Sequence, residues 1–343
     1  MTPVAVPTMP VRPVSWTRLS WVSWRRYRAT LAAIAAVLAV IAFYLVLNGE
    51  RMRSTYATYL ACTPVHSASC QFAWENFRNG YSQPGLPGVI LLFLPGIIGG
   101  FVGAPILARE LETGTFRYAW TQGAGRMRWA IAAIAPGVVG VAVIMAGFGA
   151  LVTWHNKPLL DSGITPRLHP TVFPVTGLAV AGWALVGFAL GVLAGLLWRR
   201  VLPALATALA AWFGLALLTA QIRMHYLPPL TTTSLELSGK NFGIDQWWTK
   251  SGVRVSDAAI NAVLQSIGFQ QPGGSGKITV NPGEANPSVD PVQYLIQHGY
   301  TQVTSYQPDS RYWTFQWIEL GWLTALALAL LAAAFWFLRR RPA

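Results

Sequence analysis

Six long, uncharged and strongly apolar runs constrain the fold of this chain more than any other feature of its sequence. The runs cover about residues 29–49, 86–108, 129–153, 173–197, 201–221 and 317–338. A helix needs about 20 such residues to cross the roughly 30 Å hydrocarbon core of a bilayer. The runs are continuously apolar and lack the polar/apolar alternation of membrane barrel strands. The sequence therefore predicts an all-α polytopic membrane protein with six transmembrane helices.

The composition agrees with this class, because 53% of the residues are hydrophobic and 11% are charged. Arginines concentrate in the segments on one side of the predicted spans. Those segments hold fourteen arginines and two glutamates, whereas the opposite segments hold eleven basic and nine acidic groups. The positive-inside rule then places both termini in the cytoplasm. The net positive charge of the chain reflects this topology and is not interpreted as a sign of nucleic-acid binding.

The spans divide the chain into segments. The Pro-rich residues 1–13 are expected to be a disordered tail. In residues 14–28, aromatic side chains and arginines fall on opposite faces of a helix, which predicts a cytoplasmic interfacial helix; a simple aromatic and arginine flank of the first span is the alternative. The remaining segments are transmembrane helices 1–5 (29–221) with a cytoplasmic loop at 109–128, an extracellular domain (222–316), transmembrane helix 6 (317–338) and a cytoplasmic tail (339–343).

The segment 222–316 is too long for a turn and is predicted to form a small external domain. Ser256-Asp257 can cap a helix that ends at Gly268. The apolar residues on the inner face of this helix would be Ile260, Val263, Leu264 and Ile267. Asp290-Pro291 begins a second helix that ends at Gly299. The inward residues of the second helix would be Val292, Leu295 and Ile296.

Cys62 and Cys70 are the only cysteines, and both fall in the first outer loop, at about 50–85. An exterior location permits a disulfide, and their short separation makes closure easy. His66 lies midway between them, so the three side chains could instead align on a helix as metal ligands. Pro64 disfavours a regular helix, and a fourth ligand is missing from the pattern. We therefore expect a disulfide and no metal site.

No segment carries a recognisable catalytic pattern. The stretch Gly273–Thr279 superficially resembles a phosphate-binding loop, which needs Gly, four residues and then Gly-Lys-Ser/Thr. Gln271 stands where the first glycine belongs, and Ile278 stands where the hydroxyl residue belongs. We therefore predict a non-catalytic chain that holds no cofactor of its own.

Two patterns inside the spans concern helix packing. Gly187, Gly191 and Gly195 recur every four residues in the fourth span, and similar glycine pairs occur in the second. Small residues at this spacing let helices approach closely, here most simply within one bundle. The second span also contains Pro95 and Pro105 and is expected to be kinked.

Glu319 is the only ionisable residue predicted to lie within a span, at the outer start of the last one. An ionisable group at such a depth is a candidate for a substrate or proton role. The alternative is an interfacial carboxylate that reaches water among the neighbouring tryptophans. The sequence leaves both interpretations open.

A charged segment, Arg109–Trp129, lies between the second and third runs, and charges this close to hydrocarbon must face water. It contains Arg109-Glu110-x-Glu112-x-Gly114-Thr115, followed by Arg126 and Arg128. This pattern resembles the cytoplasmic coupling loop of type-2 ABC transporter permeases. Four further motifs occur in order: Trp21-Val22-Ser23-Trp24-Arg25, Phe101-Val102-Gly103-Ala104-Pro105, Trp120-Thr121-Gln122 and Tyr306-x-Pro308-x-x-Arg311-x-Trp313-x-Phe315-Gln316-x-x-Glu319. Together they are similar to an actinobacterial subfamily of these permeases.

The resemblance implies the membrane-spanning subunit of an ATP-driven exporter in a bacterial plasma membrane. Two permeases, commonly a homodimer, would pair with two cytoplasmic ABC ATPase subunits, which bind the ATP and magnesium. The substrate, a hydrophobic or amphipathic drug, antibiotic or lipid, would pass between the two permeases. A helix from Phe116 to about Gln122, capped by Thr113 or Thr115, would transmit closure of the ATPases. The implied coupling residues are Arg109, Glu110, Glu112, Gly114, Thr115, Phe116, Arg117 and Tyr118.

Two other function classes compete with this interpretation. A membrane sensor or scaffold would bind a ligand with the external domain and signal through the loop at 109–128. A secondary transporter would be expected to show inverted repeats and ionisable groups near the bilayer midplane. The sequence shows no evident repeat and only Glu319 near one edge, so the secondary transporter is disfavoured.

Overall fold

The computed structural model describes residues 16–63, 67–82, 85–114, 126–266 and 290–340. Within these residues, six helices are long and apolar enough to cross a membrane, which confirms the predicted fold class. They comprise Ala32–Leu60, Gly88–Thr113, Arg126–Asp161, Ala179–Trp198, Val201–His225 and Asp309–Arg340. The predicted tail at 1–13 lies outside the described residues.

The chain divides into two compact units. The first, which we call the bundle unit, comprises residues 1–159, 170–221 and 313–343. The second, which we call the sheet unit, comprises residues 160–169 and 222–312. The sheet unit therefore takes most of its chain from the insertion before the last span. It also includes residues 160–169, which were not predicted to belong to the external domain.

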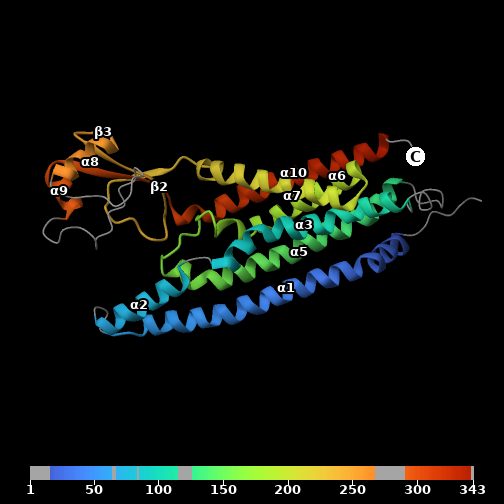
Figure 1. Ribbon diagram of the computed structural model, residues 1–343, viewed down its shortest axis with the longest axis horizontal. Coiled ribbons are helices and arrows are strands. Elements are labelled where there is room, and N and C mark those ends of the chain that lie inside the picture. Colours follow the sequence, from blue (N-terminus) through green and yellow to red (C-terminus); the bar gives the residue numbers. More distant parts are fainter. Residues whose placement is uncertain (1–15, 64–66, 83–84, 115–125, 267–289, 341–343) are drawn as a thin grey trace, which may run out of the picture. The chain divides into compact units, whose positions relative to one another are not determined.

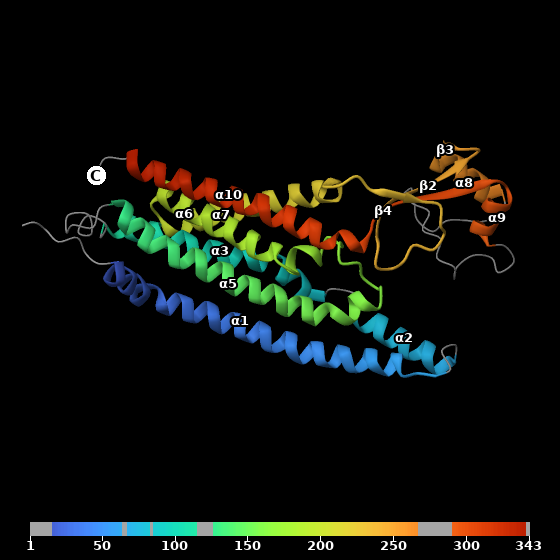
Figure 2. The ribbon, with the colours of Figure 1, turned by 180° about the vertical axis from the view of Figure 1, so that it is seen from behind.

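The long helices of the bundle unit run side by side in both views of the structure (Figures 1 and 2). The helices of this unit are α1 (Trp16–Leu60), α2 (Ala68–Tyr81), α3 (Gly85–Thr113), α5 (Arg126–Asp161), α6 (Ala179–Trp198), α7 (Val201–Ile222) and α10 (Tyr312–Arg340). Successive spans alternate in direction, so arginines from several helices gather at one end. We call this the arginine end, defined by Arg28, Arg109, Arg126, Arg128, Arg199, Arg200, Arg339 and Arg340.

Two predicted boundaries differ from the structure. Helix α1 is continuous from Trp16 to Leu60, so residues 16–28 continue into the first span and do not form a separate helix. Helix α6 begins at Ala179, whereas the apolar run predicted a start at 173. The run fails as a guide here because Phe173–Val175 form a 3₁₀ turn and Gly177 adopts a left-handed conformation with φ of 65°. Apolarity alone does not report such a break.

The segment between α1 and α3 is helical rather than an open loop. Cys62 and Cys70 are joined by a disulfide with their Cα atoms 5.5 Å apart. Ser67 caps α2, since its hydroxyl accepts a hydrogen bond from the Cys70 backbone nitrogen at 3.3 Å. The ring of Tyr56 packs 5.0 Å from that of Phe77, which is fully buried. The disulfide and the aromatic contacts together fold α2 back along α1. His66 lies outside the described residues.

Helices α3 and α6 pack against each other through glycines. A Cβ atom at Gly191 would lie 2.6 Å from the Ala104 backbone nitrogen. A Cβ atom at Gly195 would lie 2.7 Å from the Ala104 oxygen, and one at Gly103 would overlap the Phe188 carbonyl. No larger residue fits without moving a backbone. The glycine spacing in the sequence therefore marks packing within one chain, as predicted.

A four-stranded antiparallel sheet in the order β1-β4-β2-β3 forms the frame of the sheet unit. Its strands are β1 (Leu230–Thr232), β2 (Phe242–Lys250), β3 (Val253–Val255) and β4 (Tyr300–Gln307). Ser251 and Gly252 connect β2 to β3 with φ of 50° and 80°, which is the geometry of a tight two-residue hairpin turn. The sequence analysis missed this sheet. The Ser-Gly pair between two β-prone runs was the available signal.

Two helices of the sheet unit, α8 (Asp257–Ser266) and α9 (Pro291–Gln297), pack on the sheet where the sequence placed them. Ile260, Leu264 and Leu295 form a buried cluster with Trp248 of β2. Asp290 caps α9, as predicted, by accepting a hydrogen bond from the Val292 nitrogen at 2.9 Å. The prediction that Ile296 points inward is wrong, because it is 41% exposed. Ile267 and Gly268 lie outside the described residues.

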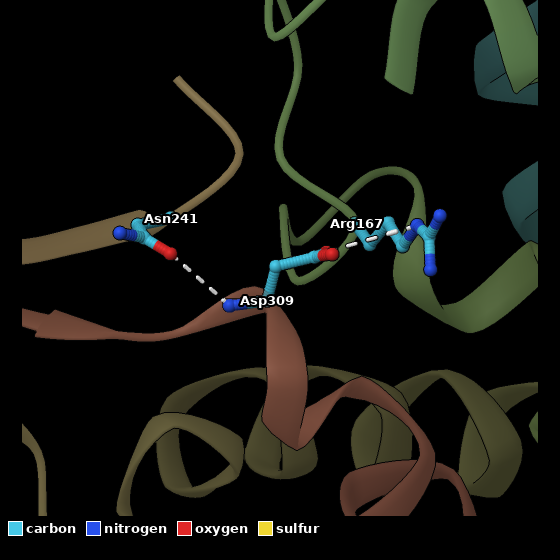
Figure 3. A network of polar contacts seen from close by, with 3 residues as sticks. All are labelled: Arg167, Asn241 and Asp309. Atoms are coloured by element: carbon cyan, nitrogen blue, oxygen red, sulfur yellow. Dashed lines mark hydrogen bonds and ion pairs between the residues drawn. The ribbon is translucent and has the colours of Figure 1, made fainter. Parts of the chain in front are cut away.

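A polar contact attaches the recruited segment 160–169 to the rest of the sheet unit (Figure 3). Arg167 Nε lies 3.7 Å from Asp309 Oδ1, and the Asp309 backbone nitrogen donates to Asn241 Oδ1 at 3.2 Å. The Arg167 guanidinium also lies 5.7 Å from the centre of the Tyr312 ring. A short connection between two spans is thereby held by charges that are distant in sequence. This pairing was not predictable from local pattern.

Candidate functional site

The charged segment that follows α3 begins at a defined helix end. Gly114 comes directly after the last residue of α3 and has a φ of 72°, the left-handed conformation that stops a helix. Thr113 donates a hydrogen bond from its hydroxyl to the Arg109 carbonyl at 2.9 Å. Thr113 is the last residue of α3, and the helix that it was predicted to cap lies outside the described residues. The chain leaves α3 at the arginine end and returns there at Arg126, the start of α5.

The structure describes half of the predicted coupling residues. Thr115, Phe116, Arg117 and Tyr118 lie outside the described residues, as does the expected helix from Phe116 to about Gln122. The other four stand in the last turn of α3 and just after it: Arg109, Glu110, Glu112 and Gly114. Their environments can be compared directly.

The side chains of Arg109 and Glu112 are exposed, whereas Glu110 is only 5% exposed. Glu110 and Glu112 are two positions apart on a helix and therefore point in nearly opposite directions, so Glu110 faces the bundle while Glu112 faces outward. A buried carboxylate cannot present itself to a protein outside the bundle. The coupling role predicted for Arg109, Glu110, Glu112 and Gly114 stays a prediction; in this structure the side chains of Arg109 and Glu112 are accessible and that of Glu110 is buried.

Glu112 joins two helices that are remote in sequence. Its Oε2 accepts a hydrogen bond from the Val201 backbone nitrogen at 3.2 Å. Val201 is the first residue of α7, where backbone N–H groups lack helical partners and the helix dipole favours a negative charge. Arg199 and Arg200, which form the turn between α6 and α7, stand next to this contact. A carboxylate of the candidate site at the end of the second span, α3, thus caps the fifth span, α7.

Indole side chains connect α6 to its neighbours deeper in the bundle. Trp212 of α7 donates its Nε1–H to the Trp183 carbonyl of α6 at 2.9 Å. The two rings meet edge to face with centres 5.5 Å apart. Trp212 also lies against Gly96 of α3, where a Cβ atom would clash with the indole. Helices α3, α6 and α7 therefore form one closely packed group beneath the charged segment.

Glu319 of α10 is fully buried, at 0% exposure, and its Oε1 accepts a hydrogen bond from Trp183 Nε1 at 2.7 Å. The interpretation of Glu319 as an interfacial carboxylate that reaches water is therefore wrong. Sequence position placed it near a span end, but the neighbouring helices cover it. This hydrogen bond joins α10 to α6 and uses one of the two carboxylate oxygens of Glu319.

A Glu319→Gln variant separates this structural role from a proton role. Glutamine keeps an oxygen acceptor for the Trp183 indole but cannot release a proton, so we expect stability near that of the parent protein. If Glu319 carries protons, transport should lose its pH dependence in this variant. Transport by the parent protein and by the variant, measured over the same series of pH values, checks this. Unchanged transport and an unchanged pH profile would remove the proton role.

The side chain of Gln316 makes four hydrogen bonds in this part of the bundle, and the sequence did not predict a role for it. Its Oε1 accepts hydrogen bonds from the backbone nitrogens of Leu178 at 3.0 Å and Ala179 at 2.8 Å. Its Nε2 donates to the carbonyls of Thr176 at 3.2 Å and Phe173 at 3.4 Å. The side chain is 0% exposed. An uncharged polar residue close to Glu319 in an otherwise apolar helix was the signal that could have identified it.

Comparison with known proteins agrees with the helical bundle. A family model described as ABC-2 membrane transporter related matches residues 35–223. This range covers most of α1 and all of α3, α5, α6 and α7, together with the charged segment between α3 and α5. No curated protein and no solved structure matches the chain.

Proposed function

We propose, from the premise that the chain belongs to the ABC-2 membrane transporter related family, that it is the permease of an ABC exporter powered by a separate ATPase. Membership and the six apolar helices make it a multi-pass membrane permease. The observation that carries the proposal is the family match across the charged segment at the arginine end. The chain offers no nucleotide-binding pattern in its sequence, so the energy for transport would come from a partner.

The proposed arrangement places the arginine end in the cytoplasm, where the positive-inside rule expects it. Two copies of the chain would form a homodimer and would bind two ABC ATPase subunits through the segment after α3. The sheet unit and the Cys62–Cys70 disulfide would then lie outside the cell. A disulfide persists in that oxidising location, which supports the orientation.

The contacts of the bundle suggest how closure of the ATPases would act on the spans. A push on the segment after Gly114 acts first on α3, to which it is covalently joined. The glycine contacts pass the movement to α6, and the Glu112–Val201 hydrogen bond passes it to α7. Packed interfaces of this kind shift between discrete arrangements rather than deforming continuously. Helices α3, α6 and α7 would therefore move as a group, opening a path for a hydrophobic or amphipathic substrate.

Co-expression of the tagged chain with an ABC ATPase encoded beside it tests the proposal. The two proteins should co-purify, and inverted vesicles that contain both should accumulate apolar drugs or antibiotics only when ATP is supplied. A Phe116→Ala, Arg117→Glu double variant should insert normally but lose this coupling. Arg339→Glu makes the same charge change at an exposed position of the arginine end and should retain it. An ATPase that co-purifies without any ATP-dependent uptake would indicate a sensor instead.

Replacing Glu112 tests the route to α7. Glu112→Ala removes the acceptor for the Val201 nitrogen, and loss of a helix cap costs about 0.5–2 kcal/mol. We expect the complex to assemble and hydrolyse ATP but to transport less substrate for each ATP consumed. Glu112→Gln keeps an acceptor oxygen and should restore most of the ratio. Equal ratios of transport to hydrolysis in the Ala and Gln variants would contradict a positioning role for Glu112.

A further inference from the structure

An apolar cavity of about 710 Å³ lies between α1, α3 and α5 of the bundle unit. It occupies the half of the bundle nearest the arginine end, since its lining includes Ala32 near the start of α1, Pro105 near the end of α3 and Ala133 near the start of α5. Residues of α6, α7 and α10 do not line it. Its volume is that of a typical small-molecule site.

Small residues and the course of α1 create this cavity. Ala32 and Ala35 of α1 and Gly137 and Gly140 of α5 are among the residues that line it. A Cβ atom at Gly140 would meet no other atom within 4 Å, so the space there is open. At its other end α1 is held close to α5, where the Arg53 guanidinium lies 3.6 Å from the centre of the Trp154 ring. Helix α1 is thus anchored at one end and separated from α5 at the other.

An apolar cavity of this volume would not stay empty in a membrane. Apolar side chains that border an unfilled space lose dispersion contacts, so filling this pocket with apolar atoms is favourable. Water is a poor occupant, because nearly all of the lining residues are apolar and offer few polar partners. A flexible hydrocarbon chain from the surrounding lipid satisfies the lining without further cost.

The one charged residue in the lining, Arg28, identifies the head group that would accompany such a chain. Arg28 is exposed and stands at the arginine end of α1. Among the described residues, no carboxylate forms an ion pair with it. Basic residues between spans at this level of a membrane bind the phosphates of anionic lipids. A guanidinium over an apolar cavity therefore matches an anionic head group joined to an acyl chain.

We propose that this cavity is a binding site for an anionic phospholipid of the leaflet at the arginine end. One acyl chain fills the space between α1, α3 and α5, and the phosphate binds Arg28. The lipid completes the packing of α1, which the protein side chains leave unfinished there. The site does not depend on the exporter function, since it requires neither ATP nor a substrate.

Lipid retention by the full-length purified protein tests the site. The protein is exchanged into mixed vesicles of phosphatidylglycerol and phosphatidylcholine, extracted gently, and analysed by native mass spectrometry. The parent protein should retain phosphatidylglycerol in preference to phosphatidylcholine. Arg28→Gln should lower retention by about tenfold, because a charge-assisted hydrogen bond is lost. Gly140→Phe should lower it by a similar factor, because the ring fills the cavity.

Matched controls are available on the same two helices. Arg25 is exposed and lies over the Trp21 ring outside the cavity lining, so Arg25→Gln should retain the lipid. Gly147 of α5 is also surrounded by open space but does not line the cavity, so Gly147→Phe should retain it as well. Thermal unfolding of each variant in detergent verifies that it is folded before retention is compared.

Three results would overturn the proposal. Equal retention by the Gly140→Phe and Gly147→Phe proteins would show that the lipid binds elsewhere. A rise in retention after deletion of residues 2–13 would show that the N-terminal segment is the natural occupant. Loss of dimers in the Gly140→Phe protein with no change in retained lipid would assign the cavity to a second copy of the chain.

Discussion

A Gln316→Leu variant is expected to lose roughly 3 kcal/mol of folding free energy, because four backbone groups each lose their hydrogen bond to the Gln316 side chain. Gln316 satisfies the Leu178 and Ala179 nitrogens at the start of α6 and two carbonyls of the preceding turn. Water cannot replace these contacts in the interior of a bundle. The midpoint of thermal or denaturant unfolding in detergent measures the loss.

Two further variants make this result specific to the hydrogen bonds. Gln221→Leu makes the same substitution at an exposed position of α7 and should leave the unfolding midpoint nearly unchanged. Gln316→Glu keeps the acceptor for the two nitrogens but loses the donor to the two carbonyls, so it should fall between the parent and the leucine variant. A leucine variant as stable as the Gln221→Leu protein would show that the contacts contribute nothing.

A Gly103→Val variant is expected to prevent normal packing of α3 on α6, with a cost of about 3 kcal/mol or more. The added side chain would overlap the backbone of Phe188, which cannot rotate away as a flexible side chain can. Overpacking of a tight interface usually costs about 1–3 kcal/mol, and a backbone clash lies at the upper end of that range. The fraction of monodisperse protein after extraction, measured by size-exclusion chromatography, checks the prediction.

The intrinsic effect of valine in a helix needs a control. At Gly147 in α5 and Gly214 in α7, an added Cβ atom would meet no other atom within 4 Å, so the first carbon of a valine side chain has open space at either position. Both variants share the change in helix propensity with Gly103→Val but not the clash. They should remain monodisperse. Equal behaviour of all three variants would mean that close approach of α3 and α6 is not needed for folding.

The sequence predicted the number and type of the membrane helices because each apolar run carries its own signal. Every span needs about 20 apolar residues to cross the bilayer, regardless of which helices it packs against. Helix caps were likewise readable, as Asp290 at the start of α9 shows. Local backbone breaks were not: the turn around Gly177 lies inside an apolar run, so the fourth span is shorter than predicted. The sheet was missed because β2 and β4 are only partly buried, so their apolar pattern is weak, and because β1 and β3 have three residues each.

The candidate site was located by its charged residues and by family resemblance, but its connections were not predictable. Nothing in the sequence around Glu112 indicates that it caps α7, because Val201 stands far along the chain. Nor does local pattern distinguish Glu110, which is buried, from Glu112, which is exposed. Both are glutamates in the last turn of one helix, and only their neighbours separate them.

The sequence by itself determined the membrane class, the six spans, the insertion before the last span and the position of the charged segment. These properties follow from length, apolarity and charge, which act residue by residue. The tertiary structure decided which helices pack as a group, which polar groups are satisfied and where a cavity remains. Those properties depend on pairs of residues that are distant in the chain, such as Gln316 with Ala179 and Gly191 with Ala104. Their energies arise only when the helices meet.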